Sequence, residues 1–523
     1  MSYKVLIPTA GLGSRLGKYT KFLNKSLVNI NLKPTISYQI EKFPKDVEFV
    51  IALGYKGNLV KQFLQIAYPK NKFIFVQIDN YEGPGSGLGL SIKKCMKYLK
   101  EPFIFMSCDT LVTENIPAPS CDWMAYSKVE NNKQYRSLKI YKDQVIDIFE
   151  KDKSDDYCYP YIGLAGIKNT VAFWDQIISG EDLAIEVGES YALKKLCNDI
   201  RISSFEFTWF DTGNLESLKK VKQYFKKVDD PVILEKDNES IWFVDNKVIK
   251  FSDDKNFIRN RVKRAELIRD FVPLITDRTE NMYAYEKVDG KILSEIINIP
   301  KFKKLLDHSN LFWKDVTLKS NELDNFKINC LEFYKSKTVK RIDLFFKKFN
   351  RKDSITYINE EKIPKVIDIL ENLNWDNLSE GIPSYFHGDF HFENILFDIK
   401  MEKFTFLDWR QDFGSYINCG DRYYDFAKLM HGLIVNHKII EDNLFSVHWE
   451  DDILNFDINR KYTLVECEQY FNHWLDKKNY SSKKVNLLTA LIYLNIAGLH
   501  HYPYSELLFG LGKSMLYKNH LDT

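Results

Sequence analysis

The sequence has no CxxC pair, no long apolar run and almost no net charge. Its eight cysteines are scattered, so we expect neither a disulfide framework nor a cysteine-based zinc site. The formal net charge of +2, from 74 basic and 72 acidic residues, gives no overall field that would attract nucleic acid or an anionic membrane. Neither partner is therefore expected, and any phosphate binding must be local.

Two segments that would place the protein outside the cytoplasm are also missing. Nothing like a secretory leader precedes the first strand-like run, so we expect a cytoplasmic location. The longest apolar stretch, LLTALIYLNIAGL at residues 487–499, is interrupted by Thr489 and Asn495 and is too short to cross a bilayer. It is expected to form a buried helix. No pattern indicates an oligomeric state.

The length of 523 residues, 45% of them hydrophobic, predicts at least two domains. Across residues 1–228, apolar runs alternate with helical stretches, which predicts a Rossmann-like α/β domain with a mostly parallel mixed sheet. The charged segment KKVDDPVILEKDNES marks a boundary. Residues 229–523 predict a two-lobed α+β domain, with a small lobe of antiparallel strands at about 229–290 and a large helical lobe at about 291–523.

A glycine-rich turn follows the first strand. KVLIPTA leads into GLGSRLG, where glycines let backbone N–H groups approach a phosphate before a helix begins. Leu16 occupies the third glycine of a dinucleotide fingerprint, and Tyr19 stands where a Walker loop needs Ser or Thr. Such a turn can be purely structural, but Arg15 and Lys25 bring two cations to it, which favours a triphosphate.

Two predicted strands of this domain end in a carboxylate. Asp109 ends the run IFMSCD and Asp211 ends FEFTWFD. Strand-end carboxylates can share Mg²⁺, a hard cation that prefers oxygen ligands and bridges phosphates. The alternative for Asp211 is that it caps the following helix.

These motifs resemble the nucleotidyltransferases that make nucleotide-activated sugars and CDP-activated alcohols. The family's GxGxR loop and downstream lysine match this chain, and the resemblance implies that Arg15 and Lys25 neutralise the departing pyrophosphate while Asp109 and Asp211 hold Mg²⁺. EGPGSGLGLS, residues 82–91, matches the loop that reads the base. The nucleotide-binding residues so implied are Ala10, Gly11, Gly13, Ser14, Gly83, Ser86 and Gly87.

Lys151, in the sequence FEK, matches a lysine that contacts the incoming phosphate monoester in that family. The family often has proline at the next position, where this chain has Asp152. Lys151 is therefore predicted to bind the phosphomonoester substrate, with an ordinary surface lysine as the alternative.

A second motif, HGDFHFENILF, lies at residues 387–397. Its spacing lets Asp389 accept a hydroxyl proton while Asn394 holds a metal, and Asp408 at the end of KFTFLD is placed to be a second metal ligand. The alternative is that His387 and Asp389 cap turns and that Asp408 pairs with Arg410.

The residues upstream of this motif also fit a kinase. Lys250 in NKVIKF ends what we expect to be the third strand of a hairpin series, and Glu266 lies in the next helix, as in the ion pair that positions ATP phosphates. YAYEKVDGKIL resembles the hinge that hydrogen-bonds adenine, near Glu286 and Val288.

Residues 231–523 resemble the aminoglycoside phosphotransferase and choline kinase superfamily, which has a protein-kinase-like fold. The resemblance implies ATP and Mg²⁺ as cosubstrate and cofactor, Asp389 as catalytic base, and Asn394 and Asp408 as metal ligands. The segment LEKDNESIWFV has no glycine where protein kinases have several, which argues against protein phosphorylation. Asp421 and Asp425 in GDRYYDFAKLMHGL are predicted to be structural.

The product of one predicted reaction is the substrate of the other. A small alcohol and ATP would give a phosphomonoester, which would attack a nucleoside triphosphate, expected to be CTP, to give a nucleotide-activated alcohol and pyrophosphate. Such products commonly feed surface polysaccharide or head-group synthesis. Choline or ethanolamine is the first expectation, because both resemblances include enzymes for that pair. Recognition of choline would need an aromatic cage, for which the chain offers Trp209, Trp409, Tyr423 and Tyr424, with core packing as the alternative.

Three other functions stay open. A sugar, sugar acid or polyol is the rival substrate, because it would be held by Asn, Asp and Arg side chains. One domain could instead have lost its chemistry and serve as a sensor or scaffold. Aminoglycoside phosphorylation ranks last, because it leaves the transferase domain without a purpose. The sequence does not show whether an intermediate would pass directly between the two sites.

Overall fold

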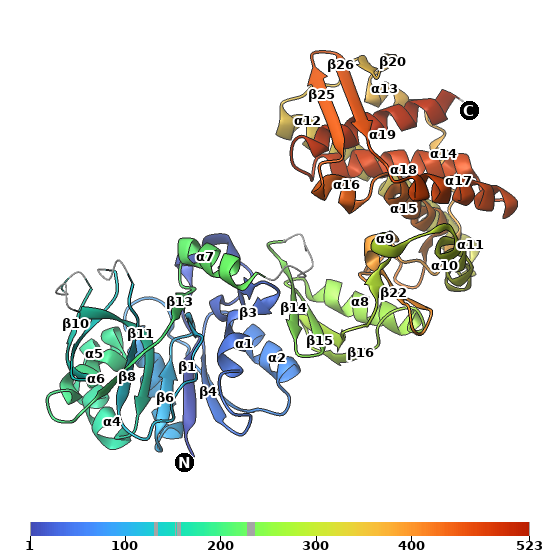
Figure 1. The fold of residues 1–523 in the computed structure, drawn as a ribbon. Coiled ribbons are helices and arrows are strands. Elements are labelled where there is room, and N and C mark those ends of the chain that lie inside the picture. Colours follow the sequence, from blue (N-terminus) through green and yellow to red (C-terminus); the bar gives the residue numbers. More distant parts are fainter. Residues whose placement is uncertain (1, 130–133, 152, 154–157, 227–235, 522–523) are drawn as a thin grey trace. The chain divides into compact units, whose positions relative to one another are not determined.

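The computed structural model describes residues 2–129, 134–151, 153, 158–226 and 236–521 (Figure 1). The described residues form two units, the first from Met1–Ile258 and Thr276–Glu286, and the second from Arg259–Ile275 and Lys287–Thr523. The boundary predicted at residues 228 and 229 lies outside the described residues.

Among the described residues, nine strands of the first unit form one mixed sheet in the order β5-β4-β1-β6-β11-β8-β12-β10-β9. Its first four strands are parallel, as the alternation of strands and helices predicts. The remainder is mixed, because β11 runs antiparallel to both β6 and β8. The strand bounds are β1 Lys4–Pro8, β4 Glu48–Leu53, β5 Lys72–Gln77, β6 Phe103–Met106, β8 Trp123–Tyr126, β9 Ser137–Tyr141, β10 Gln144–Phe149, β11 Cys158–Ile167 and β12 Ser203–Glu206.

Smaller elements complete the α/β part of this unit. Two short strand pairs, β2 with β3 and β7 with β13, lie outside the large sheet. Their bounds are β2 Asn29–Ile30, β3 Lys33–Pro34, β7 Thr110–Val112 and β13 Trp209–Asp211. The helices are α1 Thr35–Ile40, α2 Gly57–Ala67, α3 Leu88–Cys95, α4 Thr170–Ser179, α5 Glu181–Val187, α6 Glu189–Leu196 and α7 Leu215–Phe225, with 3-10 turns at Ser14–Thr20, Lys25–Leu27 and Met96–Tyr98.

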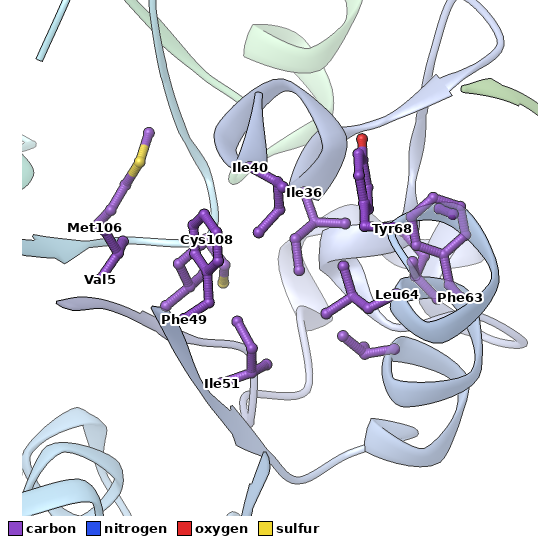
Figure 2. Packing of buried hydrophobic residues seen from close by; sticks show 14 of the residues in the cluster. Val5, Ile36, Ile40, Phe49, Ile51, Phe63, Leu64, Tyr68, Met106 and Cys108 are labelled. Carbon is purple, nitrogen blue, oxygen red and sulfur yellow. The ribbon is translucent and has the colours of Figure 1, made fainter. Parts of the chain in front are cut away.

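The sheet is covered on both faces because its buried strands alternate their side chains between two cores. Val5 and Ile7 of β1 belong to one core, together with α1 and α2, whereas Leu6 belongs to the other, together with α3, α4 and α6. In the first core, side chains from β4, α1 and α2 gather in one apolar cluster (Figure 2). This layered arrangement leaves the loops at the strand ends to bind ligands.

A second, antiparallel sheet belongs mainly to the first unit. Its order is β14-β15-β17-β16, with bounds β14 Glu239–Val244, β15 Lys247–Ser252, β16 Ile275–Arg278 and β17 Met282–Glu286. Among the described residues, β14 and β15 precede helix α8 (Lys255–Leu267), and Lys250 lies within β15 rather than at the end of a strand.

This small sheet shares the hydrophobic core of the large one. Trp242 of β14 is fully buried and packs edge-on against Phe63 of α2, with ring centroids 5.1 Å apart. Polar contacts reinforce the junction, since Phe243 N donates to Leu32 O at 2.7 Å and Lys247 Nζ donates to Ile66 O at 2.9 Å. The small sheet therefore packs as part of the first unit.

The second unit is mainly helical. Its strands are β18 Lys291–Ile292, β19 Thr356–Ile358, β20 Glu361–Ile363, β21 Pro383–Ser384, β22 Ile395–Asp398, β23 Lys403–Phe406, β24 Gly420–Asp421, β25 Phe445–Glu450 and β26 Ile453–Ile458. Its helices are α9 Leu293–Ile296, α10 Ile299–Phe312, α11 Ser320–Leu331, α12 Lys337–Phe349, α13 Val366–Glu371, α14 Trp375–Ser379, α15 Arg422–Ile434, α16 His437–Glu441, α17 Tyr462–Lys477, α18 Ser482–Ala497 and α19 Tyr504–Leu521, with a π-helical turn at Glu332–Ser336.

Helix α18 contains most of the apolar stretch at residues 487–499, and nearly all of its side chains are buried. The expected buried helix is thereby confirmed. None of the helices formed by the described residues combines the length and the apolar character that crossing a bilayer requires.

Candidate functional site

The pairing of β7 with β13 brings Asp109 and Asp211 together. In the antiparallel register, Asp211 lies opposite Thr110, the residue that follows Asp109 in the sequence. Thr212 N donates to Asp109 O at 3.0 Å. A methyl group on the Cα of Gly213 would lie 3.0 Å from Asp211 Oδ1 and 3.1 Å from Asp109 Oδ2. Both carboxylates therefore face one point, as strand-end acids must if they are to share a cation.

Both predicted cations reach the same place. Lys25 Nζ lies 3.2 Å from Asp109 Oδ2, and a methyl group at Gly213 would lie 3.4 Å from a terminal nitrogen of Arg15. Lys25 is held in position by Asn24, whose side chain caps the 3-10 turn and donates to Thr9 O and Tyr55 O. The sequence prediction that these residues converge on one site is consistent with this geometry.

The glycine-rich turn lies against Lys25. Gly13 has φ 68°, a left-handed conformation that favours glycine, and a side chain there would meet Lys25 Cβ at 2.8 Å. Gly11 has open space around it, and Ser14 and Arg15 are exposed at the start of the 3-10 turn. Ala10 is buried, and its carbonyl accepts from Tyr55 N. The turn thus offers an accessible backbone next to two cations.

The electrostatics of the two aspartates differ. Burial raises the pKa of Asp109, but Lys25, a hydrogen bond from Ser107 and Arg15 outweigh it, and the pKa falls to about 2. Burial raises the pKa of Asp211, with Asp109 as an additional repelling charge. A divalent cation between the two carboxylates would remove that repulsion.

The donor set fits Mg²⁺, because the converging atoms are carboxylate oxygens. Asp211 is not the cap of α7: Asn214 caps that helix by accepting from Ser217 N, and Asn214 Nδ2 donates to Asp211 Oδ2. The described residues contain no cluster of three or more His, Cys, Asp or Glu side chains arranged to hold a metal. The proposed ion would therefore rest on this pair of carboxylates, with its other ligands supplied by phosphate and water.

The predicted base-reading loop lies at the start of α3. Gly83 and Gly85 have φ of 83° and 76°, and the hydroxyl of Ser86 donates to Gly83 O at 2.7 Å, which closes the turn. Gly87 packs closely on the backbone of Ile185, where a side chain would not fit. Lys151 is exposed after β10. The roles of the loop in reading the base and of Lys151 in binding the phosphomonoester stay predictions.

Two residues at this site were not predicted. Ser107 donates to Asp109 Oδ1 at 2.5 Å, and Tyr135 donates to Asp211 Oδ2 at 3.2 Å while its ring packs edge-on against Trp209. Ser107 could have been suspected from its place in the same strand end. Tyr135 carries no local signal, because its segment is far from both aspartates in sequence.

A buried acid, Glu189, begins helix α6. Its exposure is 2%, and burial raises the pKa of its carboxyl to about 7, although Arg136 and Tyr161 partly oppose the rise. When the pKa of a carboxyl is higher in the folded protein than its ordinary 4.5, the group's contribution to the free energy of unfolding is fully present below pH 4.5. That contribution is lost as the pH rises through the folded pKa of about 7.

We therefore expect Glu189→Gln to raise the thermal unfolding temperature at about pH 8.5 and to change it little at about pH 5. The gain at high pH should approach about 3 kcal/mol, because each pKa unit corresponds to about 1.4 kcal/mol. Differential scanning calorimetry across this range measures the effect, and Glu186→Gln, at an exposed position on α5, is the matched control. A pH-independent difference would contradict the buried ionisation.

In the second unit, Asp389 lies in a network of cations and amides. Lys428 Nζ of α15 lies 2.9 Å from Asp389 Oδ1, and Asn394 Nδ2 donates to Asp389 Oδ2 at 3.2 Å. Burial opposes ionisation, but Lys428 and His391 hold the pKa of Asp389 well below its ordinary value. Its side chain is 41% exposed, so a substrate hydroxyl can reach it. Because Asn394 donates through Nδ2, its Oδ1 is the atom suited to a metal.

The loop that carries Asp389 is held in place by the carboxylate of Asp425. The backbone N–H groups of His387 and Gly388 donate to Asp425 at 2.6 and 2.7 Å, and Trp313 Nε1 donates to it at 3.0 Å. Asp421 caps α15 by accepting from Tyr423 N. These contacts agree with the structural roles predicted for both aspartates.

His387 links this loop to β23. Its Nε2 donates to Leu407 O at 2.7 Å while Nδ1 accepts from Asp389 N at 3.2 Å. Burial lowers the pKa of the imidazole to about 3, which is consistent with this neutral form. His391 is the opposite case: burial opposes its charge, but Asp389 and Glu393 raise its pKa to about 9. One histidine of the motif therefore positions the loop and the other adds a positive charge.

Asp408 has φ 58°, a strained conformation for a residue that is not glycine. Its Oδ1 lies 3.3 Å from Arg261 Nη1, an ion pair that the sequence did not predict. Leu407 N donates to Asn394 O at 2.7 Å, which places the segments of Asn394 and Asp408 side by side. This hydrogen bond brings the backbones at the two predicted metal ligands close together, and their role as ligands stays a prediction.

The remaining predicted kinase residues fall on both units. Lys250 is buried in β15, opposite Ile241 and Tyr283, and Glu286 is the last residue of β17. Glu266 lies near the end of α8, and Val288 lies in the loop after β17; both residues belong to the second unit. Their roles with ATP stay predictions.

Of the aromatic residues considered for a choline cage, three are part of the second unit's core. Trp409, Tyr423 and Tyr424 have exposures of 1%, 8% and 6%, and Trp409 Nε1 donates to Arg261 O. Trp209 is partly exposed beside Tyr135 in the first unit. Lys428, which contacts Asp389, was not predicted, although a lysine within the apolar face of GDRYYDFAKLMHGL was a visible signal.

Comparisons with known proteins place the first of these sites in context. No known family profile matches the chain. The "Bifunctional protein GlmU" of Methanococcus maripaludis is 24% identical over 230 residues, covering 42% of this chain and 54% of the relative. The D-glycero-alpha-D-manno-heptose 1-phosphate guanylyltransferase of Campylobacter jejuni is 28% identical over 110 residues, covering 20% and 48%.

Among solved structures, the CTP:phosphocholine cytidylyltransferase of Streptococcus pneumoniae covers 43% of this chain and all of its own, with 19% identity and a TM-score of 0.37. The chain spans about half the length of the curated relatives it matches. The N-terminal half of the chain thus matches nucleotidyltransferases in sequence.

Proposed function

We propose that the chain is a bifunctional enzyme that phosphorylates a small alcohol with ATP and then transfers a nucleotidyl group to the resulting phosphomonoester. The convergence of Asp109, Asp211, Arg15 and Lys25 on one point supports the second activity. The first activity is supported by Asp389 and its neighbours Asn394 and Lys428.

In nucleotidyl transfer, the phosphate monoester is already an anionic nucleophile, so little acid-base chemistry is needed. Its oxygen attacks the α-phosphorus, and the bond to the β-phosphate breaks to release pyrophosphate. Arg15 and Lys25 would neutralise the charge that builds on the leaving group, and Asp109 and Asp211 would hold Mg²⁺. When bound, Mg²⁺ would bridge phosphate oxygens and screen their charge.

In phosphoryl transfer, the alcohol oxygen attacks the γ-phosphorus of ATP and ADP departs. Asp389 is ionised and exposed, so it can accept the hydroxyl proton. Asn394 and Asp408 would hold Mg²⁺ through carbonyl and carboxylate oxygens, which are suitable ligands for that ion.

The nucleotide is proposed to be CTP, as the family resemblance implies. GTP is the alternative, because one relative is named a guanylyltransferase. For the alcohol, choline or ethanolamine and the sugar, sugar-acid or polyol class are the two candidates, and a role in surface polysaccharide or head-group synthesis follows from either.

A coupled assay on the full chain tests the proposal. ADP formation is followed with ATP, Mg²⁺ and each candidate alcohol, and each nucleoside triphosphate is then added while pyrophosphate release is followed. We expect pyrophosphate to appear only after the alcohol has been phosphorylated or when its phosphomonoester is supplied. Pyrophosphate release without any phosphomonoester requirement would refute the order, and the absence of both signals would refute the proposal.

A further inference from the structure

A cavity of about 710 Å³ lies along the π-helical turn and the start of α12 in the second unit. Three of its lining residues are cations and one is an acid; the lining residues are Glu332, Ser336, Lys337, Lys340, Arg341 and Leu344. The three cations lie together at the start of α12 and form the basic wall of the cavity, which gives its lining an excess of positive charge.

The cavity adjoins the segment that carries Asp389. Two cations lie over the ring of Phe333: Lys337 Nζ is 4.1 Å from the ring centroid, and Arg410 Cζ is 4.8 Å from it. Arg410 in turn packs on the loop of the candidate base, because a methyl group on Gly388 would lie 2.5 Å from Arg410 Cβ. A chain of direct contacts therefore joins the basic wall of the cavity to the neighbour of Asp389.

The positive charges around this cavity exceed the negative ones that could balance them. Burial lowers the pKa of Lys337 to about 7, and repulsion from Arg410, Lys428 and Arg341 adds to the effect. Asp389 is already paired with Lys428 at 2.9 Å and faces the charged ring of His391. Mutual repulsion between close cations is relieved when an anion binds among them.

We propose that the alcohol phosphorylated by the second unit carries an anionic group of its own, a carboxylate or a phosphate, which Lys337, Lys340 and Arg341 bind while its hydroxyl reaches Asp389. This inference rests on the proposed kinase function. A cation such as choline, ethanolamine or an aminoglycoside would be repelled by the same wall. The sugar-acid alternative is therefore favoured over the quaternary amine, because it supplies both groups.

An acidic alcohol would be phosphorylated by the same bond changes as a neutral one. The hydroxyl oxygen of the acidic alcohol bonds to the γ-phosphorus, the bond from that phosphorus to the β-phosphate oxygen breaks, ADP leaves, and the hydroxyl proton goes to Asp389. The product carries its original anionic group and a new phosphomonoester, which is the group that the first unit would use as nucleophile.

A panel of four alcohols with the full chain tests the inference. Choline, glycerol, D-glycerate and glycerol 3-phosphate present a cation, a neutral polyol, a carboxylate and a phosphate on comparably small frameworks. We expect kcat/KM for ADP formation with one of the two anions to exceed that with glycerol at least tenfold and that with choline by more. The two anions distinguish a carboxylate site from a phosphate site. A preference for choline would overturn the inference.

Charge reversal at an exposed lining position sharpens the test. Lys340→Glu should raise KM for the preferred anion at least tenfold and leave KM for glycerol unchanged, while Lys337→Arg should retain the preference. Lys335→Glu is the matched control, because Lys335 is exposed on the π-helical turn just before α12 and is not among the residues that line the cavity. An equal effect of Lys335→Glu and Lys340→Glu would overturn the assignment.

A binding measurement separates failure of this inference from failure of the kinase proposal. Titration calorimetry with glycerol 3-phosphate and with D-glycerate is expected to show binding that Lys340→Glu weakens. Binding of an anion without any ADP formation would refute the kinase and support the site. Phosphorylation of choline without binding of either anion would support the kinase and refute the site.

Discussion

Asp389→Asn is expected to reduce ATP-dependent phosphorylation of the alcohol by about a thousandfold, within the range found when a positioned general base is removed. The asparagine cannot accept the hydroxyl proton, and its amide would leave Lys428 without its anionic partner at 2.9 Å. Pyrophosphate release from a supplied phosphomonoester should remain at the wild-type rate. ADP and pyrophosphate assays on the same protein preparation measure both effects.

The control for this variant is Asp324→Asn, at an exposed position on α11, which should retain both activities. Equal loss of both activities in Asp389→Asn would contradict the independence of the two sites. Unchanged phosphorylation would show that the second unit is not a kinase working through this aspartate, and would favour a sensor or scaffold.

Asp109→Ala should produce the opposite pattern. Loss of one of the two carboxylates that face Gly213 removes a ligand of the proposed Mg²⁺ and leaves Lys25 without its partner at 3.2 Å. We expect nucleotidyl transfer to fall by about a thousandfold, similar to the loss of a major electrostatic contact in an active site. Phosphorylation of the alcohol should be unaffected.

Pyrophosphate release as a function of Mg²⁺ concentration gives a further measure of this variant. The variant should need more Mg²⁺ for half-maximal activity than the wild type, and Asp175→Ala, at an exposed position on α4, should not. Wild-type rates and an unchanged Mg²⁺ requirement in Asp109→Ala would remove the aspartate from the metal site.

The parts of the first site that were predictable are those set by local sequence. Under the rule that site residues gather where strands end, Asp109 just after β6 and Asp211 at the end of β13 were predictable, but their convergence depends on the pairing of β7 with β13. The turn at Gly13 and the nearby Lys25 follow from the same rule. The contact from Tyr135 to Asp211 could not be expected, because it depends on how a distant segment packs.

The second site shows the same limit more strongly. HGDFHFENILF fixes the spacing of Asp389 and Asn394, and the structure brings them within 3.2 Å. The partners of the motif, Lys428 from α15 and Arg261 for Asp408, come from segments whose approach depends on tertiary packing. The large sheet was predicted to be mixed and mostly parallel, but which of its strands run antiparallel could not be predicted, since apolar runs do not reveal strand direction.

The burial of Trp242 against Phe63 has a consequence for anyone who wishes to divide the protein. A shortened polypeptide ending near residue 228 would lose the strands that cover this face of α2. It would therefore expose a hydrophobic patch, which promotes aggregation. The complementary fragment would lose the surface on which its own first strands rest. The two proposed activities are therefore better separated by point substitutions than by truncating the chain.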